Sequence, residues 1–245
     1  ALPIWIFPDR ATDLTSNLIH IRRSCEHMDY YYIYNQNGSK TVKETFSLTG
    51  NGKPYLLNCW NGKIHKLDKY TVEEDRITLQ LTLAPNEVVT IGIGDLGEEF
   101  TDLVHDDMFL KELILRDWEL SVKSYYPGKE PYETEYKEIE CGKVPLVSWS
   151  QIEGLINVSG IGTYKSKFNL ENNVSRCLLS FEDAADTVKV ILNGKVFFPN
   201  QITKEVEITE GICEGDNEIL IEIATTLNNA LYAKGDKEER QDYGL

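Results

Sequence analysis

The 245-residue sequence contains no run of about 20 apolar residues, the length that a helix needs to cross a bilayer. It is also short of positive charge, because 25 lysines and arginines stand against 40 aspartates and glutamates, which gives a net charge of −15. Such a surface repels polyanions. We therefore expect neither nucleic acid nor a membrane as a partner, and we attribute most of the acidic excess to solubility.

Histidine and cysteine are scarce and scattered, with four histidines and five cysteines. No CxxC pair occurs, which argues against a zinc or redox site. We expect the cysteines to be buried free thiols. No cofactor is expected, although "FEDAAD" (181–186) and "EGDNE" (214–218) offer oxygen ligands for a structural calcium. Solvated turns are the alternative interpretation of both stretches.

Familiar catalytic signatures are missing as well. The sequence has no nucleophile elbow, HExxH, P-loop or GxGxxG motif, and no alternation of strands and helices that would build a barrel. Glycoside hydrolysis needs two carboxyl groups about 5–10 Å apart, and here the acids cluster in turns, a central linker and the tail. We expect the chain to be non-catalytic. The opening "ALPIWIFPDR" lacks the features of a signal peptide, and we favour a fragment of a larger protein over a mature form.

The sequence consists mainly of short runs of β-branched and aromatic residues. "RITLQLTLAP" (76–85) alternates, which predicts a strand with one buried face, and "NEVVTIGIG" (86–94) is its expected partner. Asn-Gly turns separate several of the runs, as in hairpins. The pattern predicts a β-sandwich over residues 16–95, followed by a linker at 95–111 that holds the one expected short helix.

Strand patterns return at 113–127 and again after residue 144, spaced about 10–14 residues apart, which is typical of a sandwich or jelly roll. The stretch 128–143 is charged and predicts a solvated loop or hairpin. Gly160 and Gly162 would allow a close approach to another backbone or a positive φ. The predicted fold is all-β, with two β-sandwich domains at 1–111 and 112–245.

The order of motifs in the second half resembles a known family. "VSGIGTYKSKFNL" (158–170), "LSFEDAADTVKVILNGK" (179–195), "VEITEGICEGDNEILIEIATTLNNALY" (206–232) and the final "YGL" are arranged as in the sugar-binding jelly roll of family 2-type glycoside hydrolases. They are most similar to the C-terminal region of family 106, the α-L-rhamnosidase-like enzymes. The first half resembles the sandwich that follows the catalytic barrel in the same proteins. The resemblance implies a galactose-binding-like jelly roll at 112–245 and catalytic carboxylates that lie upstream of residue 1.

The resemblance also implies site residues. In related jelly rolls, the loop at the Asn-Gly turn and the loop after the last long strand reach the sugar site of the barrel. These loops correspond to Asn193 and to Asn228 or Asn229, where the second position is often acidic in the relatives. Trp60, beside the turn in "NCWNGK", is a further candidate for stacking on a sugar ring, or else a core residue. Trp149 is expected to be a core residue.

The implied function is that of a C-terminal accessory part of a large glycoside hydrolase. Its expected partners are the catalytic barrel of the same parent chain and an oligo- or polysaccharide. Three alternatives stay open at this point: a free-standing carbohydrate-binding module, a structural or protein-interaction sandwich, and a complete small enzyme with an unrecognised carboxylate pair. The turns and glycines above are also needed for folding alone.

Overall fold

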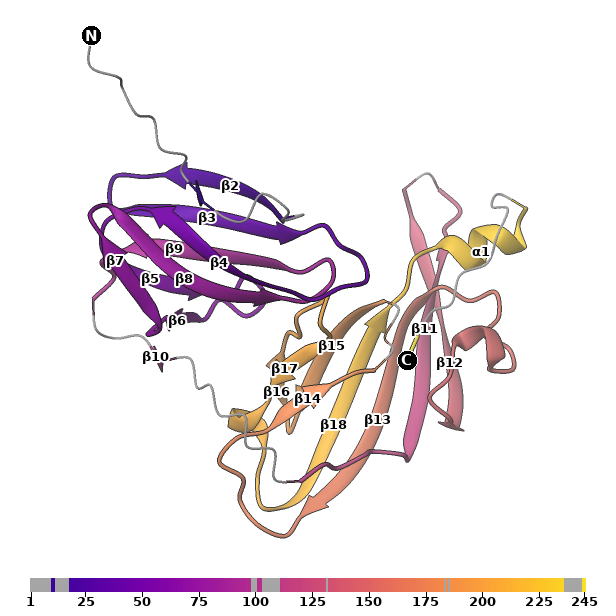
Figure 1. Cartoon of the computed structure of the whole chain (residues 1–245). Helices are drawn as coiled ribbons and strands as arrows, with labels where there is room; N and C mark the ends of the chain where they lie inside the picture. Colours follow the sequence, from indigo (N-terminus) through magenta and orange to yellow (C-terminus); the bar gives the residue numbers. More distant parts are fainter. Residues whose placement is uncertain are drawn as a thin grey trace. The chain divides into compact units, whose positions relative to one another are not determined.

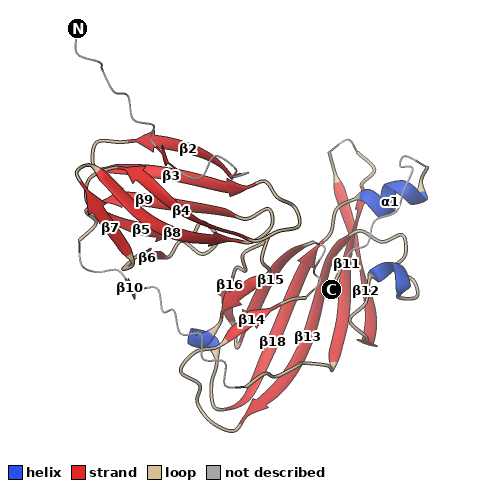
Figure 2. Cartoon of the chain, viewed as in Figure 1, coloured by secondary structure: helices blue, strands red, loops and turns tan. Residues whose placement is uncertain are grey.

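The computed structural model describes residues 10–11, 18–97, 101–102, 111–130, 132–182, 184, 186–235 and 244–245. Within these ranges the chain is all-β, as predicted, with strands throughout both halves (Figure 2). It divides into two compact units, 1–108 and 109–245, called unit 1 and unit 2 below. The division expected from the sequence lay at 111/112.

Unit 1 is a sandwich of two sheets around one core (Figure 1). The four-stranded sheet has the order β1 (Arg10–Ala11), β4 (Val42–Thr49), β8 (Arg76–Leu83) and β7 (Tyr70–Glu73). The six-stranded sheet has the order β10 (Thr101–Asp102), β6 (Ile64–Lys66), β5 (Lys53–Leu57), β9 (Val88–Gly94), β3 (Met28–Asn35) and β2 (Leu18–Ser24). All paired strands are antiparallel except β10 and β6.

The alternation of β8 is confirmed, because Ile77, Leu79 and Leu83 are buried while Gln80 and Thr82 are exposed. The predicted pairing of β8 with the strand that follows it is wrong. β8 pairs with β4 and β7, whereas β9 lies in the other sheet between β3 and β5. The reason is the connection at 84–87, which crosses from one sheet to the other instead of closing a hairpin.

Unit 2 is built on a six-stranded antiparallel sheet with the order β12 (Thr134–Val144), β11 (Trp118–Pro127), β13 (Gly160–Leu170), β18 (Gly215–Ala224), β15 (Thr187–Leu192) and β16 (Lys195–Phe197). A two-stranded sheet of β14 (Leu178–Ser180) and β17 (Glu205–Glu207) contributes Val206 and Leu179 to the same core. The charged stretch 128–143 is largely strand, because β12 forms a hairpin with β11.

The described residues of unit 2 include three short helices: two 3-10 turns, η1 (Trp149–Gln151) and η2 (Thr209–Gly211), and α1 (Asn228–Ala233). The sequence did not predict α1. The helix expected at 95–111 falls mostly outside the described residues. Among the helices that the structure describes, none is long and apolar enough to cross a membrane.

Trp149 organises the core of unit 2. Its side chain is completely buried, and its indole Nε1 donates a hydrogen bond of 2.8 Å to the Tyr164 hydroxyl. A Cβ on Gly162 would lie 2.3 Å from Trp149 Cζ2, and a Cβ on Gly160 would lie 2.1 Å from the Lys123 carbonyl oxygen. The close approach to another backbone is therefore confirmed for Gly160, whereas Gly162 makes room for the Trp149 side chain. Trp149 is confirmed as a core residue.

The expectation of buried thiols is wrong in part. All five cysteines are free. Cys25, Cys59 and Cys213 are exposed, and only Cys141 and Cys177 are half-buried. The exposed three lie in turns or directly after strands, where the neighbouring apolar residues do not indicate burial.

Candidate functional site

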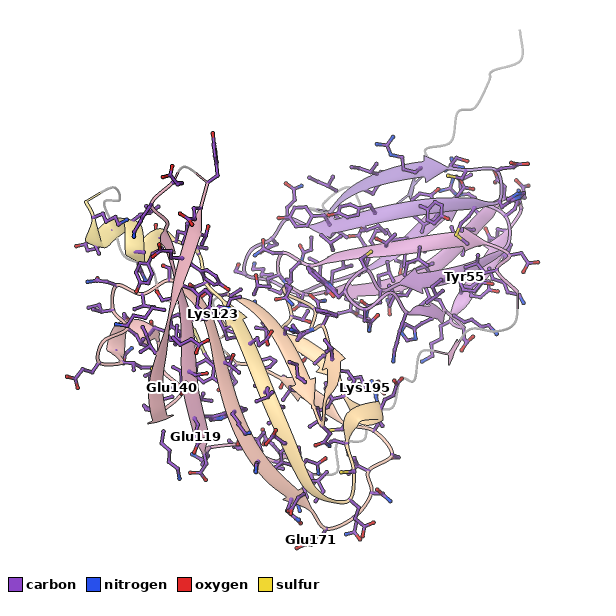
Figure 3. The ribbon with its side chains drawn as sticks, turned by 180° about the vertical axis from the view of Figure 1, so that it is seen from behind. Tyr55, Glu119, Lys123, Glu140, Glu171 and Lys195 are labelled. Atoms are coloured by element: carbon purple, nitrogen blue, oxygen red, sulfur yellow. The ribbon has the colours of Figure 1, made fainter. Side chains whose placement is uncertain are left out.

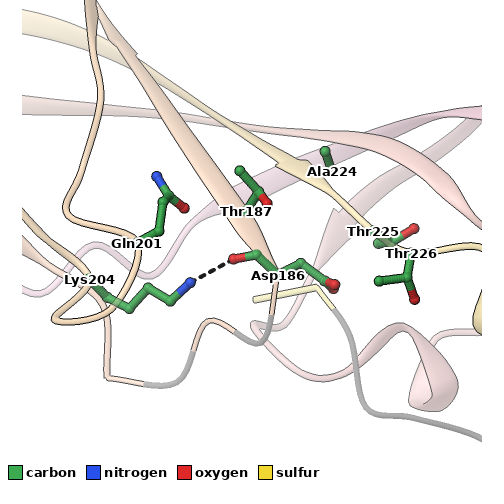
Figure 4. A pocket seen from close by; sticks show the side chains of 7 residues that line it. All are labelled: Asp186, Thr187, Gln201, Lys204, Ala224, Thr225 and Thr226. Carbon is green, nitrogen blue, oxygen red and sulfur yellow. Dashed lines mark hydrogen bonds between the residues drawn. The ribbon is translucent and has the colours of Figure 1, made fainter. Parts of the chain in front are cut away.

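A shallow hollow of about 400 Å³ lies where β15 begins and β18 ends (Figure 4). The two strands are antiparallel and pair Thr187 with Ala224, so the loops that precede β15 and follow β18 meet at this end of the sheet. The lining residues are Asp186, Thr187, Gln201, Lys204, Ala224, Thr225 and Thr226.

Asp186 is the acidic group of the hollow. Its carboxylate accepts hydrogen bonds from the backbone N–H of Gly244, at 3.0 Å, and of Thr226. Partial burial raises the pKa of Asp186, and these two N–H groups and the nearby Lys204 ammonium oppose the rise. The carboxylate therefore joins the loop after β18 to the segment at 244–245.

Lys204 supplies the opposite charge. Its backbone has a φ of +58°, and its Nζ donates a 2.7 Å hydrogen bond to the backbone oxygen of Asp186, drawn as the dashed line in Figure 4. Partial burial lowers the pKa of Lys204, against the attraction of the Asp186 carboxylate. An acid and a base thus lie together at the floor of a polar hollow.

Much of the remaining polarity serves the fold. The Thr225 hydroxyl accepts from the Gly160 N–H at 2.9 Å and donates to the Gly160 carbonyl at 3.2 Å. The Gln201 amide bonds both the N–H and the C=O of Val188. The hollow can offer donors and acceptors to hydroxyl groups. Asp186 is the one carboxylate among its described lining residues, which is fewer than glycoside hydrolysis needs.

Asn228 and Asn229 begin α1 directly beyond the loop whose Thr225 and Thr226 line the hollow, but they are not among its lining residues. The Asn228 N–H donates to the Thr226 hydroxyl at 3.4 Å, and the side chain of Asn229 is almost fully buried at 3% exposure. The sequence thus places one of its predicted sugar-contacting loops beside the hollow. Contact of either residue with sugar stays a prediction.

Asn193 lies at the opposite end of β15, away from the hollow and from α1. Its amide Nδ2 donates to Asn217 Oδ1 at 2.8 Å and to the Gly211 carbonyl at 2.9 Å, while its Oδ1 accepts from the Glu218 N–H at 2.9 Å. With φ at +50°, Asn193 leads the turn into Gly194. These contacts favour an architectural role, and the structure does not bring Asn193 together with Asn228 and Asn229.

Trp60 belongs to unit 1, in the turn after β5. The residue is 37% exposed, and its backbone N–H donates to Asn58 Oδ1 at 3.0 Å. This exposure leaves an indole surface open to solvent, which is compatible with stacking. Trp60 as a sugar-binding residue stays a prediction.

Asp186, Lys204 and Thr226 were missed as site residues at the sequence level. Asp186 lies in "FEDAAD", the stretch considered for calcium, so a signal existed but indicated other chemistry. Within the described residues, no group of three or more His, Cys, Asp or Glu side chains could hold a metal ion. In "EGDNE", Asp216 Oδ1 accepts a 2.8 Å hydrogen bond from Asn169. A structural calcium stays a prediction.

The fold is similar to part of a much larger solved protein. The structure of a rhamnosidase from Novosphingobium sp. PP1Y matches 97% of this chain with a TM-score of 0.69 and 19% sequence identity. The chain spans only 22% of the length of that rhamnosidase. No family model matches the sequence. No curated protein matches it either.

Proposed function

We propose that this chain is a non-catalytic accessory part of a large glycoside hydrolase of rhamnosidase-like type, in which it supports the catalytic barrel. The main support is that nearly the whole chain, both units included, matches about a fifth of the length of a rhamnosidase. The motif order noted in the sequence supports the finer assignment to a family 106-like enzyme, with unit 2 as its galactose-binding-like jelly roll.

The lining of the hollow does not suit glycoside hydrolysis at that place. Its one described carboxylate, Asp186, is held by two backbone N–H groups and faces Lys204. Both glycosidase mechanisms require a second carboxyl group across the scissile bond. The proposal therefore assigns the chemistry to the barrel of the parent enzyme.

Glycan contact is the second part of the proposal, and we assign it to the hollow with the half-buried Asn228, while the buried Asn229 would hold the start of α1 in place. Its donors and acceptors suit sugar hydroxyls. Asn193 is less suited, since its amide is engaged within its own turn. Trp60 would serve as a separate stacking residue in unit 1.

The test compares the chain with its parent enzyme on an aryl α-L-rhamnoside. We expect no turnover by the 245-residue chain, and loss of thermal stability in the parent when these residues are deleted. Turnover by the isolated chain that is lost in Asp186→Asn would overturn the accessory role and favour a small enzyme. A parent that keeps its stability and rate after the deletion would also contradict the proposal.

Glycan-array binding by the isolated chain separates the second part from its alternatives. Saturable binding that is weakened by Asn228→Ala and kept in Asn193→Ala would support the hollow. Binding lost in Trp60→Ala alone would indicate a carbohydrate-binding module centred on unit 1. An array without hits would leave a structural role only.

A further inference from the structure

The six-stranded sheet of unit 1 has an apolar face on the side away from its core. Strand register places Ile21, Tyr32, Thr90 and Leu57 in one row across β2, β3, β9 and β5. The neighbouring row holds Ile19, Tyr34 and Val88. We call the seven residues of these two rows the outer face of unit 1.

Three of the seven residues of the outer face are exposed to solvent. Ile19, Ile21 and Tyr32 have 44%, 50% and 46% of their surface accessible. The other four members are half-buried. Isolated apolar residues on a surface need no explanation, but contiguous apolar rows mark interaction sites.

Gly92 lies on the same side of the sheet, and its lack of a side chain leaves room for two apolar neighbours. A Cβ at Gly92 would lie 2.9 Å from Met28 Sδ and 3.4 Å from Leu57 Cδ1, so both apolar side chains converge over the glycine. Tyr55, labelled in Figure 3, is paired with Gly92 in the register and is fully buried. Met28, Tyr55 and Leu57 therefore form an apolar cluster around Gly92, next to the exposed residues of the outer face.

The charged side chains on this side of β2, β3, β5, β6 and β9 are basic. By register, the described side chains that share this side of β2, β3, β5, β6 and β9 include Arg23, Lys53 and Lys66 and no carboxylate. The whole chain carries a net charge of −15. Protein interfaces are enriched in tyrosine and arginine and depleted of acidic residues at their centre.

We propose that the outer face of unit 1 docks onto another folded domain of the parent hydrolase, which presents an apolar patch rimmed by carboxylates. This inference rests on the proposed function. The matched rhamnosidase is several times longer than this chain, so most of such a protein lies outside the 245 residues and is available to cover the face. The two exposed isoleucines favour a protein over a glycan, because sugar platforms combine aromatic rings with polar groups that bind hydroxyls.

The experiment mixes the 245-residue chain with the parent polypeptide that lacks these residues, and measures association by sedimentation velocity and calorimetry. We expect a complex that the double variant Ile19→Glu/Ile21→Glu weakens at least about tenfold, because it places carboxylates at the centre of an apolar contact. Val72→Glu is the matched control, since Val72 is 56% exposed on the other sheet of the same unit. The melting temperature of each isolated variant checks that it folds.

The outcomes separate the two levels of the proposal. Equal weakening by the double variant and the control, or by neither, would overturn the docking face and leave the accessory function standing. Absence of any complex would contradict both. Self-association of the isolated chain that the double variant abolishes would make the occupant a second copy, and loss of glycan binding by the same variant would make it a sugar. Either result overturns the proposal.

Discussion

The two six-stranded sheets differ in the side chains that they carry on the side away from the core. In unit 1, isoleucines and tyrosines occupy the rows that point away from the core. In unit 2, ion pairs lie on the corresponding side, with Lys165–Glu218 at 2.8 Å and Lys189–Glu222 at 2.6 Å, beside the half-buried Ile191 and Leu220. Figure 3 shows Glu119, Lys123 and Glu140 on β11 and β12 of the same sheet. A ladder of ion pairs is satisfied in water, whereas an apolar face gains from being covered.

Each unit also has its own core, and the largest expected effect tests that independence. Trp149→Ala removes the fully buried indole and its bond to Tyr164, which should cost unit 2 about 3–5 kcal/mol. Scanning calorimetry should show one transition moving down while the other keeps its midpoint. The matched variant Phe46→Ala in unit 1 should move the other transition. A common shift of both transitions in either variant would contradict separate cores.

A medium effect concerns the turns that hold each sheet. In unit 1, Asn35 Nδ2 donates to the carbonyls of Leu83 and Ala84, and in unit 2 Asn193 joins Gly211, Asn217 and Glu218. Asn193→Ala should lower the free energy of unfolding by about 2 kcal/mol, because partners are left unsatisfied and alanine disfavours the positive φ. Urea denaturation measures it.

The control for this turn is Asn169→Ala, which removes one exposed hydrogen bond to Asp216 and should cost much less. Equal losses in the two variants would show that the Asn193 amide contributes nothing special. Unchanged stability in Asn193→Ala together with lost glycan binding would restore the residue as a sugar ligand.

A smaller effect is the pH dependence that Asp186 gives to unit 2. Its pKa is raised in the folded state by burial, so the folded protein holds this proton more tightly than the unfolded chain does. The stabilisation from this proton is complete below the unfolded pKa and is lost as pH rises through the folded pKa. Relative to Asp186→Asn, the wild type should therefore lose stability from acid towards neutral pH. A difference that is flat or grows with pH would contradict the burial argument.

The smallest effect distinguishes the two outer faces directly. Lys189→Met breaks the partly exposed pair with Glu222 and should cost about 0.2–1 kcal/mol, less at high salt because ions screen the pair. Ile21→Lys, on the outer face of unit 1, should change stability little at any salt concentration. Thermal melts of both variants at low and high salt measure this. Equal salt dependence would show that the contrast between the faces has no energetic basis.

The sequence predicts where strands lie better than it predicts which strands pair. Alternation at 76–83 correctly identifies which residues enter the core, because period-two burial is a local property. The same pattern carries no information about the sheet in which the next strand lies. The predicted pairing of β9 with β8 is wrong for this reason. The role of Gly160 was predicted correctly, because close approach to another backbone requires glycine, whereas the Trp149 side chain that requires Gly162 could not be foreseen from the local sequence.

The candidate hollow could be predicted only in part. The loop of Asn228 and Asn229 was indicated by resemblance, and its Thr225 and Thr226 line the hollow. Asp186 and Lys204 come together through a loop and a left-handed backbone position that no local pattern reveals. The outer face of unit 1 was visible in part, because the run Tyr30–Tyr31–Tyr32 must place tyrosines on both sides of a strand. Its apolar continuity depends on register across β2, β9 and β5.

The described tryptophans of the two units differ in burial, so the two units should contribute differently to the indole fluorescence. Trp118 and Trp149 are buried in unit 2, whereas Trp60, the tryptophan that the structure describes in unit 1, is already open to solvent. Unfolding of unit 2 should therefore shift the emission of Trp118 and Trp149 strongly to the red, whereas Trp60 can report little of the loss of the mainly aliphatic core of unit 1.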